Sequence, residues 1–300
     1  MKGRNLKYLA VLLLAASAFV WLGSCDKIEQ PYTGKIEGPV DTATCPVPDF
    51  PAVTLLKKRV LLEDYTGHKC VNCPAAALIA HNLKEIHGDQ LVVLAVHAGF
   101  FAAPSASGTY ANDYRTEAGT AWDAFFGIGQ VGNPNGMVNR TGYPLNHIMS
   151  PASWSAQIGN ALATDPLVDL QMINEYDATE RKLCTHIKTR FVSSLDRNLK
   201  LIVVLAESGI ISAQKNNDAA AGDVPEIPEY EHNHMLRAAI TSPWGNQVAV
   251  KGVTNPESVV KSFKYILPEK FNAANCTAIA FVYDDDTEEV LQAVEAPVVE

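Results

Sequence analysis

Two cysteines separated by two residues, Cys70 and Cys73, are the side chains in this sequence best suited to covalent chemistry. Residues 75–87 have the apolar spacing of a helix, so Cys70 is expected at a helix N-terminus. Unpaired N–H groups and the helix dipole there stabilise a thiolate over a thiol, and Lys69 adds a positive neighbour. The pair therefore predicts a redox dithiol. Cys70, expected to be the more exposed and more reactive thiol, attacks, and Cys73 resolves the mixed disulfide.

Metal binding and an inert disulfide are the alternatives for the same pair. A zinc site built on Cys-x-x-Cys usually needs a second such pair or a histidine pair, and this sequence has none. Copper held by His68 with the two thiolates stays open, because soft ligands favour it.

Two other segments could hold a metal. His232 and His234 could face a metal from one strand, and the acidic residues 284–289 could bind calcium. Structural histidines and a solvated hairpin tip are the simpler interpretations, so the sequence predicts no metal and no cofactor.

A strand–helix–strand unit is expected to position the dithiol. Residues 59–65 contain a short apolar run typical of a buried strand, and residues 91–97 are fully apolar, as parallel strands covered on both faces require. The helix between them is expected to bury one face, which carries Leu78, Ile79, Leu83 and Ile86. This order is that of a βαβ unit.

Residues 62–73 (LEDYTGHKCVNC) resemble the active-site segment of thioredoxin-like proteins. Asp64 stands six residues before Cys70, where thioredoxins carry a buried aspartate that assists proton transfer at the second cysteine. The sequence departs from the thioredoxin pattern at Lys69, where tryptophan is usual, and at residues 71–72, where Gly-Pro is usual.

The same resemblance implies a cis-proline before the next strand, facing the dithiol. Pro134, within residues 130–140, is the candidate, and a plain turn is the other interpretation of its Asn-Pro-Asn-Gly context. The domain is expected to cover residues 58–165, with a helical insertion near 100–129 that covers the sheet or the active site. Residues 153–163 are expected to form its closing helix.

From residue 166 the apolar period changes to that of strands. Strands are expected at residues 168–176, 183–192, 200–206, 263–267 and 278–283, with a polar loop at 214–229. Short strands without helices favour an antiparallel sandwich of immunoglobulin-like architecture. The expected fold is therefore an α/β thioredoxin-like domain, followed over residues 166–300 by an all-β immunoglobulin-like sandwich domain.

The first 24 residues predict a secretory signal peptide. A short basic start is followed by apolar residues 8–22, a stretch below the ~20 residues of a membrane span. Leu-Gly-Ser-Cys at residues 22–25 resembles a bacterial lipobox, so Cys25 is expected to carry the lipid that holds the mature chain on a membrane. An ordinary signal peptide with a chance cysteine is the alternative. Residues 25–57, rich in Pro, Gly and Thr, are expected to be the lipidated tether.

The remaining cysteines are Cys45, Cys184 and Cys276. Export implies an oxidising compartment in which disulfides form. Cys184 and Cys276 lie in or beside apolar strand-like runs. A disulfide between them and two buried free thiols are both open, because sequence does not establish connectivity.

The charge of the chain argues against one class of partner. It has 24 Lys and Arg against 33 Asp and Glu, a net charge of −9. Nucleic-acid binding needs an excess of positive charge to displace counterions, so no nucleic-acid partner is expected.

The order of these features resembles the outer membrane protein 28 family of Bacteroidetes lipoproteins. The resemblance rests on the lipobox, the tether, the cysteine block, the strand at residues 136–140 (GMVNR) and the segment 230–237 (YEHNHMLR). It covers most of residues 58–295, and it implies a thioredoxin-like domain and attachment to the outer membrane of the cell envelope. It does not imply an activity, although the family's naming suggests a receptor or adhesin.

Two functions of different classes follow from the sequence. The first is thiol–disulfide exchange on exported proteins, with Cys70, Cys73, Asp64 and Pro134 as site residues. The alternative is a non-catalytic binding or adhesion lipoprotein that recognises an unidentified surface ligand through the β domain. Whether the protein is an enzyme, a thiol–disulfide oxidoreductase, is left open by the sequence.

Overall fold

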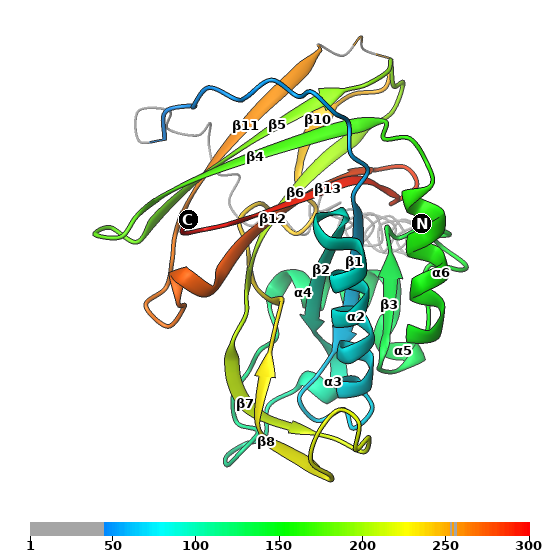
Figure 1. Cartoon of the computed structure of the whole chain (residues 1–300), viewed down its shortest axis with the longest axis vertical. Coiled ribbons are helices and arrows are strands. Elements are labelled where there is room, and N and C mark those ends of the chain that lie inside the picture. Colours follow the sequence, from blue (N-terminus) through cyan, green and yellow to red (C-terminus); the bar gives the residue numbers. More distant parts are fainter. Residues whose placement is uncertain (1–44, 253, 255–256) are drawn as a thin grey trace, which may run out of the picture. The chain divides into compact units, whose positions relative to one another are not determined.

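The computed structural model of the protein describes residues 45–252, 254 and 257–300 (Figure 1). The predicted signal peptide, the predicted lipidation site Cys25 and the tether up to residue 44 lie outside the described residues. The helices are α2 (Cys73–His87), η1 (Gly88–Gln90), α3 (Gly99–Ala102), α4 (Glu117–Phe126), α5 (Ile128–Val131), α6 (Pro151–Leu162) and η2 (Ala273–Asn275). The strands are β1 (Val60–Thr66), β2 (Leu91–His97), β3 (Asn135–Val138), β4 (Val168–Asp177), β5 (Lys182–Phe191), β6 (Leu199–Glu207), β7 (Ile210–Lys215), β8 (Glu226–His232), β9 (Met235–Ala239), β10 (Asn246–Ala249), β11 (Ser258–Ile266), β12 (Cys276–Asp284) and β13 (Val290–Pro297).

The predicted βαβ unit is confirmed. β1 and β2 pair in parallel from Val60 opposite Leu91 to Thr66 opposite His97, and α2 connects them. Both strands are almost entirely buried, as their apolar runs indicate.

The buried face of α2 differs from the prediction. Ala76, Ala80 and Leu83 face the sheet, whereas Leu78 and Ile79 are more than a third exposed and Ile86 is 73% exposed. The alanines follow the same helical spacing, and we infer that their small side chains let the helix axis approach the strands closely. The prediction assumed that the larger apolar side chains mark the packed face of the helix, and for α2 this was wrong.

A mixed sheet is the centre of the fold. Within the described residues its strand order is β13-β12-β6-β9-β2-β1-β3, with β10 also paired to β6. β9 joins the two parts of the sheet, because it pairs in parallel with β2 and antiparallel with β6. Strands on both sides of the predicted boundary at residues 165 and 166 therefore share one sheet.

The two faces of this sheet are covered differently. On one face, Trp122 and Phe126 of α4 pack against residues of β1, β2, β6 and β12, as expected for a helical insertion over the sheet. On the other face, α2 and α6 cover β1, β2 and β3. A separate three-stranded sheet, ordered β11-β5-β4, packs on that same face over β6 and β12. The described residues thus form a mixed α/β fold that consists mostly of strands, arranged in an eight-stranded, a three-stranded and a two-stranded sheet. The immunoglobulin-like assignment of residues 166–300 stays a prediction.

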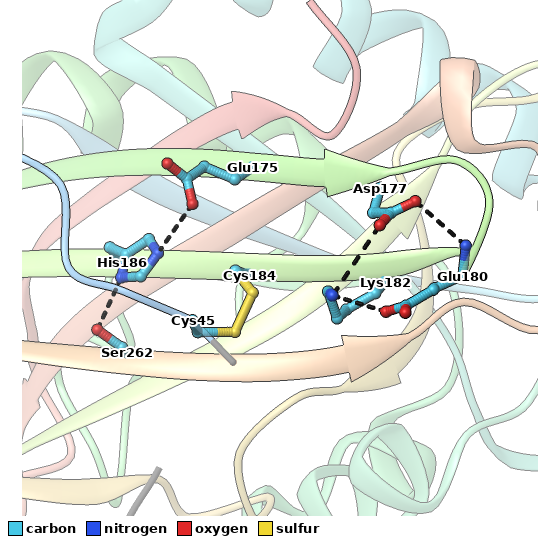
Figure 2. Close-up of a disulfide and its surroundings, with 8 residues drawn as sticks. All are labelled: Cys45, Glu175, Asp177, Glu180, Lys182, Cys184, His186 and Ser262. Carbon is cyan, nitrogen blue, oxygen red and sulfur yellow. Dashed lines mark hydrogen bonds and ion pairs between the residues drawn. A yellow bond between two sulfur atoms is a disulfide. The ribbon is translucent and has the colours of Figure 1, made fainter. Parts of the chain in front are cut away.

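A disulfide joins Cys45 to Cys184, with Cα atoms 5.6 Å apart, and Figure 2 shows it on β5 beside His186. Among the described cysteines, Cys276 is buried and unpaired. The suggested Cys184–Cys276 disulfide is therefore wrong, and so is the alternative of two buried free thiols, because only Cys276 is free in the described part of the chain. The alternation of side chains explains the difference. Leu183 and Ile187 point into the core that contains Cys276, so Cys184 points to the opposite face of its sheet.

Candidate active site at the Cys70–Cys73 pair

The Cys70–Cys73 pair lies in the turn between β1 and α2. The two residues form a disulfide with Cα atoms 5.4 Å apart. Cys73 is the first residue of α2, and Pro74 follows it in the first turn, where its missing N–H is tolerated. Cys70 therefore precedes the helix N-terminus, as predicted.

The exposure of the two cysteines contradicts the prediction that Cys70 is the more accessible. Cys70 and Cys73 are each 2% exposed. One cause is α3, because the Lys69 amide donates to the Phe101 carbonyl at 3.1 Å. Gly67 permits this contact, since a Cβ there would lie 2.4 Å from the Phe101 backbone.

Asp64 lies on the face of β1 that α2 covers. Side chains alternate along the strand, and Leu62, two residues earlier, packs in the core beneath α2. Asp64 is 3% exposed, and its Oδ1 has no hydrogen-bond partner among the described residues. Burial raises the pKa of this carboxyl from 3.8 to about 7. A buried acid that titrates near neutrality can hold or release a proton.

Pro134 is preceded by a cis peptide bond, as the sequence predicted. It comes directly before β3, which pairs antiparallel with β1 and sets Asn135 opposite Tyr65 and Gly136 opposite Asp64. The start of β3 and the end of β1 lie at one edge of the sheet, so Pro134 and the Cys70 loop follow neighbouring strand ends.

Hairpin β7–β8 is a part of the site that the sequence did not indicate, because residues 214–229 were expected to form a polar loop. Figure 1 shows the hairpin at the lower end of the molecule, close to α3 and apart from the larger sheets. Two of its amides donate to the dithiol loop, that of Lys215 to the His68 carbonyl at 2.9 Å and that of Asn217 to the Val71 carbonyl at 3.0 Å.

Gln214 makes a buried side-chain contact between the hairpin and the cysteine loop. Its Nε2 donates to the carbonyl of Cys70 at 2.9 Å and to that of Gly67 at 3.3 Å. The side chain is 2% exposed. A glutamine in a polar stretch carries no sequence signal for this role, because the contact depends on how the hairpin folds back.

Three buried histidines gather beside the dithiol loop: His68, His97 and His232. Each ring lies 5.6–5.7 Å from the ring of Tyr114, measured between centroids. Burial lowers the pKa of all three imidazoles, that of His232 to about 4, so they are neutral at pH 7. His68 Nε2 and both nitrogens of His97 have no hydrogen-bond partner within the described part of the chain.

The residues weighed as possible metal ligands lie in the following surroundings. Within residues 45–252, 254 and 257–300, no group of three His, Cys, Asp or Glu side chains is arranged to hold a metal ion. His232 contacts Tyr230 and His97, whereas His234 follows a turn beyond the end of β8. In the acidic segment 284–289, Asp284 pairs with Arg197 and Asp285 pairs with Lys200.

Comparisons with known proteins identify a family. A family model described as outer membrane protein Omp28 matches residues 121–300, a range that begins after Cys70 and Cys73. The family match therefore covers fewer residues than the range 58–295 over which the resemblance was expected. No curated protein matches the chain. None of the helices among the described residues is both long enough and apolar enough to span a membrane.

Solved structures give a likeness of fold. HBP35 of Porphyromonas gingivalis superposes with a TM-score of 0.54 at 14% identity, over 81% of this chain and 76% of that one. An Agrobacterium tumefaciens protein gives a TM-score of 0.48 at 12% identity, over 82% and 97%. A domain of the outer membrane lipoprotein Omp28 from Porphyromonas gingivalis gives 0.30 at 23% identity, over 44% and 88%.

Proposed function

Because the chain belongs to the outer membrane protein Omp28 family and is an outer-membrane protein, we propose that it is lipid-anchored there and exchanges disulfides with exported proteins. The observation that carries the redox proposal is the buried Asp64, with a pKa of about 7, on the strand face beneath the helix that Cys73 begins. An inert disulfide has no need for a proton acceptor at that position.

The proposed reaction is two successive thiol–disulfide exchanges. The Cys70 thiolate attacks a substrate disulfide, forms a mixed disulfide and expels one substrate thiolate. The Cys73 thiolate then attacks the Cys70 sulfur, which forms the Cys70–Cys73 disulfide and expels the second substrate thiolate. The substrate gains two electrons and the dithiol loses two, so an external dithiol must reduce the pair before another cycle.

Asp64 and Pro134 have separate roles in this proposal. Asp64 accepts the proton of Cys73, so that the resolving group is a thiolate when the mixed disulfide has formed. Pro134, at the start of the neighbouring strand β3, holds the substrate chain beside Cys70. Both roles presuppose that residues 58–165 form a thioredoxin-like domain, which is part of the proposal.

Trapping tests the exchange in cells. In Cys73→Ala the mixed disulfide cannot resolve, so adducts through Cys70 are expected to accumulate on non-reducing gels. Cys70→Ala/Cys73→Ala is the matched control and is expected to show no adducts. Equal patterns in the two variants would contradict the redox proposal.

The lipid anchor is tested at Cys25. Cys25→Ser is expected to move the protein from the membrane fraction to the soluble fraction, because the acyl chains cannot attach. Unchanged membrane association would show that another part of the chain holds it. This test does not depend on the dithiol.

A binding or adhesion function is the second candidate. It is favoured by the 2% exposure of both cysteines and by a family match that begins after them. In that case the β-rich part, proposed to be immunoglobulin-like, recognises a surface ligand. Absence of trapped adducts together with an unreactive Cys70 would favour this function.

A further inference from the structure

Hairpin β7–β8 covers the dithiol without being part of either larger sheet. β7 and β8 pair with each other from Ile210 opposite His232 to Lys215 opposite Glu226, and form a two-stranded sheet of their own. The chain enters the hairpin from β6 and leaves it into β9, two strands that pair in the large sheet. The hairpin is therefore an extension of the β6–β9 pair that leaves the sheet plane and folds over the cysteine loop.

The two connections of the hairpin have backbone conformations that suit a bend. Gly209 has φ of 71° and His234 has φ of 54°, both in the left-handed region. Two hydrogen bonds join these connections: the Gly209 amide donates to Asn233 Oδ1 at 3.0 Å, and the His234 amide donates to Ser208 Oγ at 3.0 Å. The bend is thus local to a few residues, and the remainder of the hairpin can move as a unit.

The contacts that hold the hairpin over the dithiol are mainly polar. Gln214 donates to two carbonyls of the cysteine loop, and the His232 ring packs against the rings of His97 and Tyr114. Besides the amides of Lys215 and Asn217, Asn217 Nδ2 donates to Asn72 Oδ1 at 2.7 Å, between the two cysteines in sequence. On the other side, the Tyr110 hydroxyl donates to Glu226 Oε2, and Lys215 Nζ lies 5.8 Å from the Tyr110 ring centroid. An element held mainly by hydrogen bonds and one buried imidazole, rather than by a broad apolar face, opens at a lower free energy than the sheet beneath it.

We propose that hairpin β7–β8 determines which disulfides reach Cys70. While the hairpin is closed, the cysteines are 2% exposed and a disulfide within a folded protein cannot approach the Cys70 sulfur. Small disulfides enter through partial opening, and a cysteine in a polypeptide chain reaches Cys70 when the hairpin lifts at Gly209 and His234. This proposal rests on the proposed redox function, and it names flexible or unfolded exported chains as the protein substrates.

Size-dependent alkylation tests the cover. The reduced full chain is treated with iodoacetamide and with a polyethylene glycol maleimide, and Cys70 labelling is followed by peptide mass, with each rate divided by that of the unfolded protein. In the wild type the bulky reagent is expected to be slowed more than the small one. In Tyr110→Phe/Asn217→Ala, which removes two hydrogen bonds of the cover, labelling by the bulky reagent is expected to be at least about fivefold faster.

Tyr176→Phe, the same loss of a hydroxyl on β4 of the three-stranded sheet, is the matched control and is expected to label at the wild-type rate. Wild-type rates with both reagents in the double variant would overturn the proposal. Equal slowing of both reagents in the wild type would do so as well.

Hydrogen exchange of the wild type supplies a test without substitutions. Amides of residues 210–232 are expected to exchange at least about tenfold faster than those of β6, because the hairpin opens by itself. Equal protection would show that the hairpin opens only with the sheet, which contradicts the proposal. Neither alkylation nor exchange needs a substrate, so both can fail while trapping succeeds, and both can succeed while trapping fails.

Discussion

Asp64 is a carboxyl group that the fold holds without a charged partner. Its pKa of about 7 results from burial alone, so the neutral acid is favoured in the folded protein far more than in the unfolded chain. The fold therefore accepts a loss of stability at neutral pH on the strand that leads into the dithiol loop. Such a loss is typical of functional sites rather than of structural ones.

The stability of Asp64→Asn is expected to differ from that of the wild type in its pH dependence. The pKa of Asp64 is higher in the folded state, so the folded protein binds the proton more tightly and its unfolding free energy falls as pH rises from about 4 to about 7. Asparagine does not titrate, so Asp64→Asn lacks this pH-dependent contribution to the unfolding free energy. Measured by urea unfolding of the oxidised protein, the variant is expected to be more stable than the wild type at pH 8, by roughly 1–4 kcal/mol, and similar to it at pH 4.

Glu288 adds a slope of the same sign, because burial raises its pKa to about 7, and the variant retains this slope. Asp165→Asn, the same substitution at an exposed residue, is the control and should leave the pH profile unchanged. If Asp64→Asn matched the wild type at both pH values, the carboxyl would be ionised in the fold and the proposed proton transfer would lose its basis.

At the residue scale, the sequence identified the side chains that could carry out thiol chemistry. It did not indicate how accessible those side chains are to a substrate. The helix start at Cys73, the burial of Asp64 and the cis bond before Pro134 follow from local spacing and a family resemblance. The burial of Cys70 could not be predicted, because it depends on Gln214 and its neighbours, which lie 144 residues away in the chain.

At the element scale, a buried ion pair joins β1 to the segment after β3. Arg140 Nε and Nη2 donate to the two carboxylate oxygens of Glu63 at 2.9 and 2.8 Å, and both side chains are fully buried. The guanidinium also lies 4.8 Å from the ring centroid of Phe126 and 5.1 Å from that of Phe281. The Arg140 guanidinium therefore joins β1, which carries Glu63, to α4 and β12, which carry the two aromatic rings.

Breaking the Glu63–Arg140 ion pair is expected to lower the stability of the fold. Arg140→Met leaves the Glu63 carboxylate buried without its partner, so the unfolding free energy should fall by roughly 3–5 kcal/mol. Denaturant unfolding measures it. Arg115→Met, which breaks an ion pair between half-exposed side chains, is the control and should cost about 0–1 kcal/mol. In Glu63→Gln/Arg140→Met the loss should be smaller than in the single variant, and a single-variant loss below that of the control would contradict the account.

Elements with a continuous or an alternating apolar pattern were predicted well, β4 and β5 among them, whereas the polar hairpin β7–β8 was not. β1, β2, β5, β6 and β12 follow from their sequence because each is buried over most of its length. β7 and β8 were missed, because most of their side chains are at least partly exposed and their order comes from pairing with each other and with the cysteine loop.

At the scale of the whole molecule, the Cys45–Cys184 disulfide fixes the start of the described chain to the three-stranded sheet. Its cysteines are 139 residues apart in sequence. Gln171 Nε2 also donates to the Pro51 carbonyl at 2.8 Å, so the segment after Cys45 lies along the same sheet. The last part of the predicted tether 25–57 is therefore attached to the three-stranded sheet from Cys45 onward.

Loss of this disulfide is expected to lower the unfolding free energy by roughly 2–5 kcal/mol, because the unfolded chain gains the entropy of a long open loop. Cys45→Ala/Cys184→Ala is compared with the wild type by urea unfolding without reductant. Cys276→Ala, which removes a buried thiol and leaves both disulfides, is the control and should cost less. Equal stability of the wild type and the double variant would show that the pair carries no constraint.

The division of the chain into two domains was drawn from a change of apolar period near residue 166. That change is real, because strands dominate from β4 onward. Sequence period does not reveal which strands pair, however, and β9 inserts between β2 and β6. Long-range pairing of this kind is decided by the whole fold rather than by any local segment.

The most direct test of the redox proposal is a transfer of two electrons in solution. The reduced full chain is mixed with an unfolded protein that contains one disulfide, and the products are quenched with acid and mapped by peptide mass. We expect one Cys70–Cys73 disulfide to form for each substrate disulfide that is reduced, and we expect no transfer in Cys70→Ser. Substrate disulfides that stay intact, or that are reduced equally by Cys70→Ser, would contradict thiol–disulfide exchange at this site.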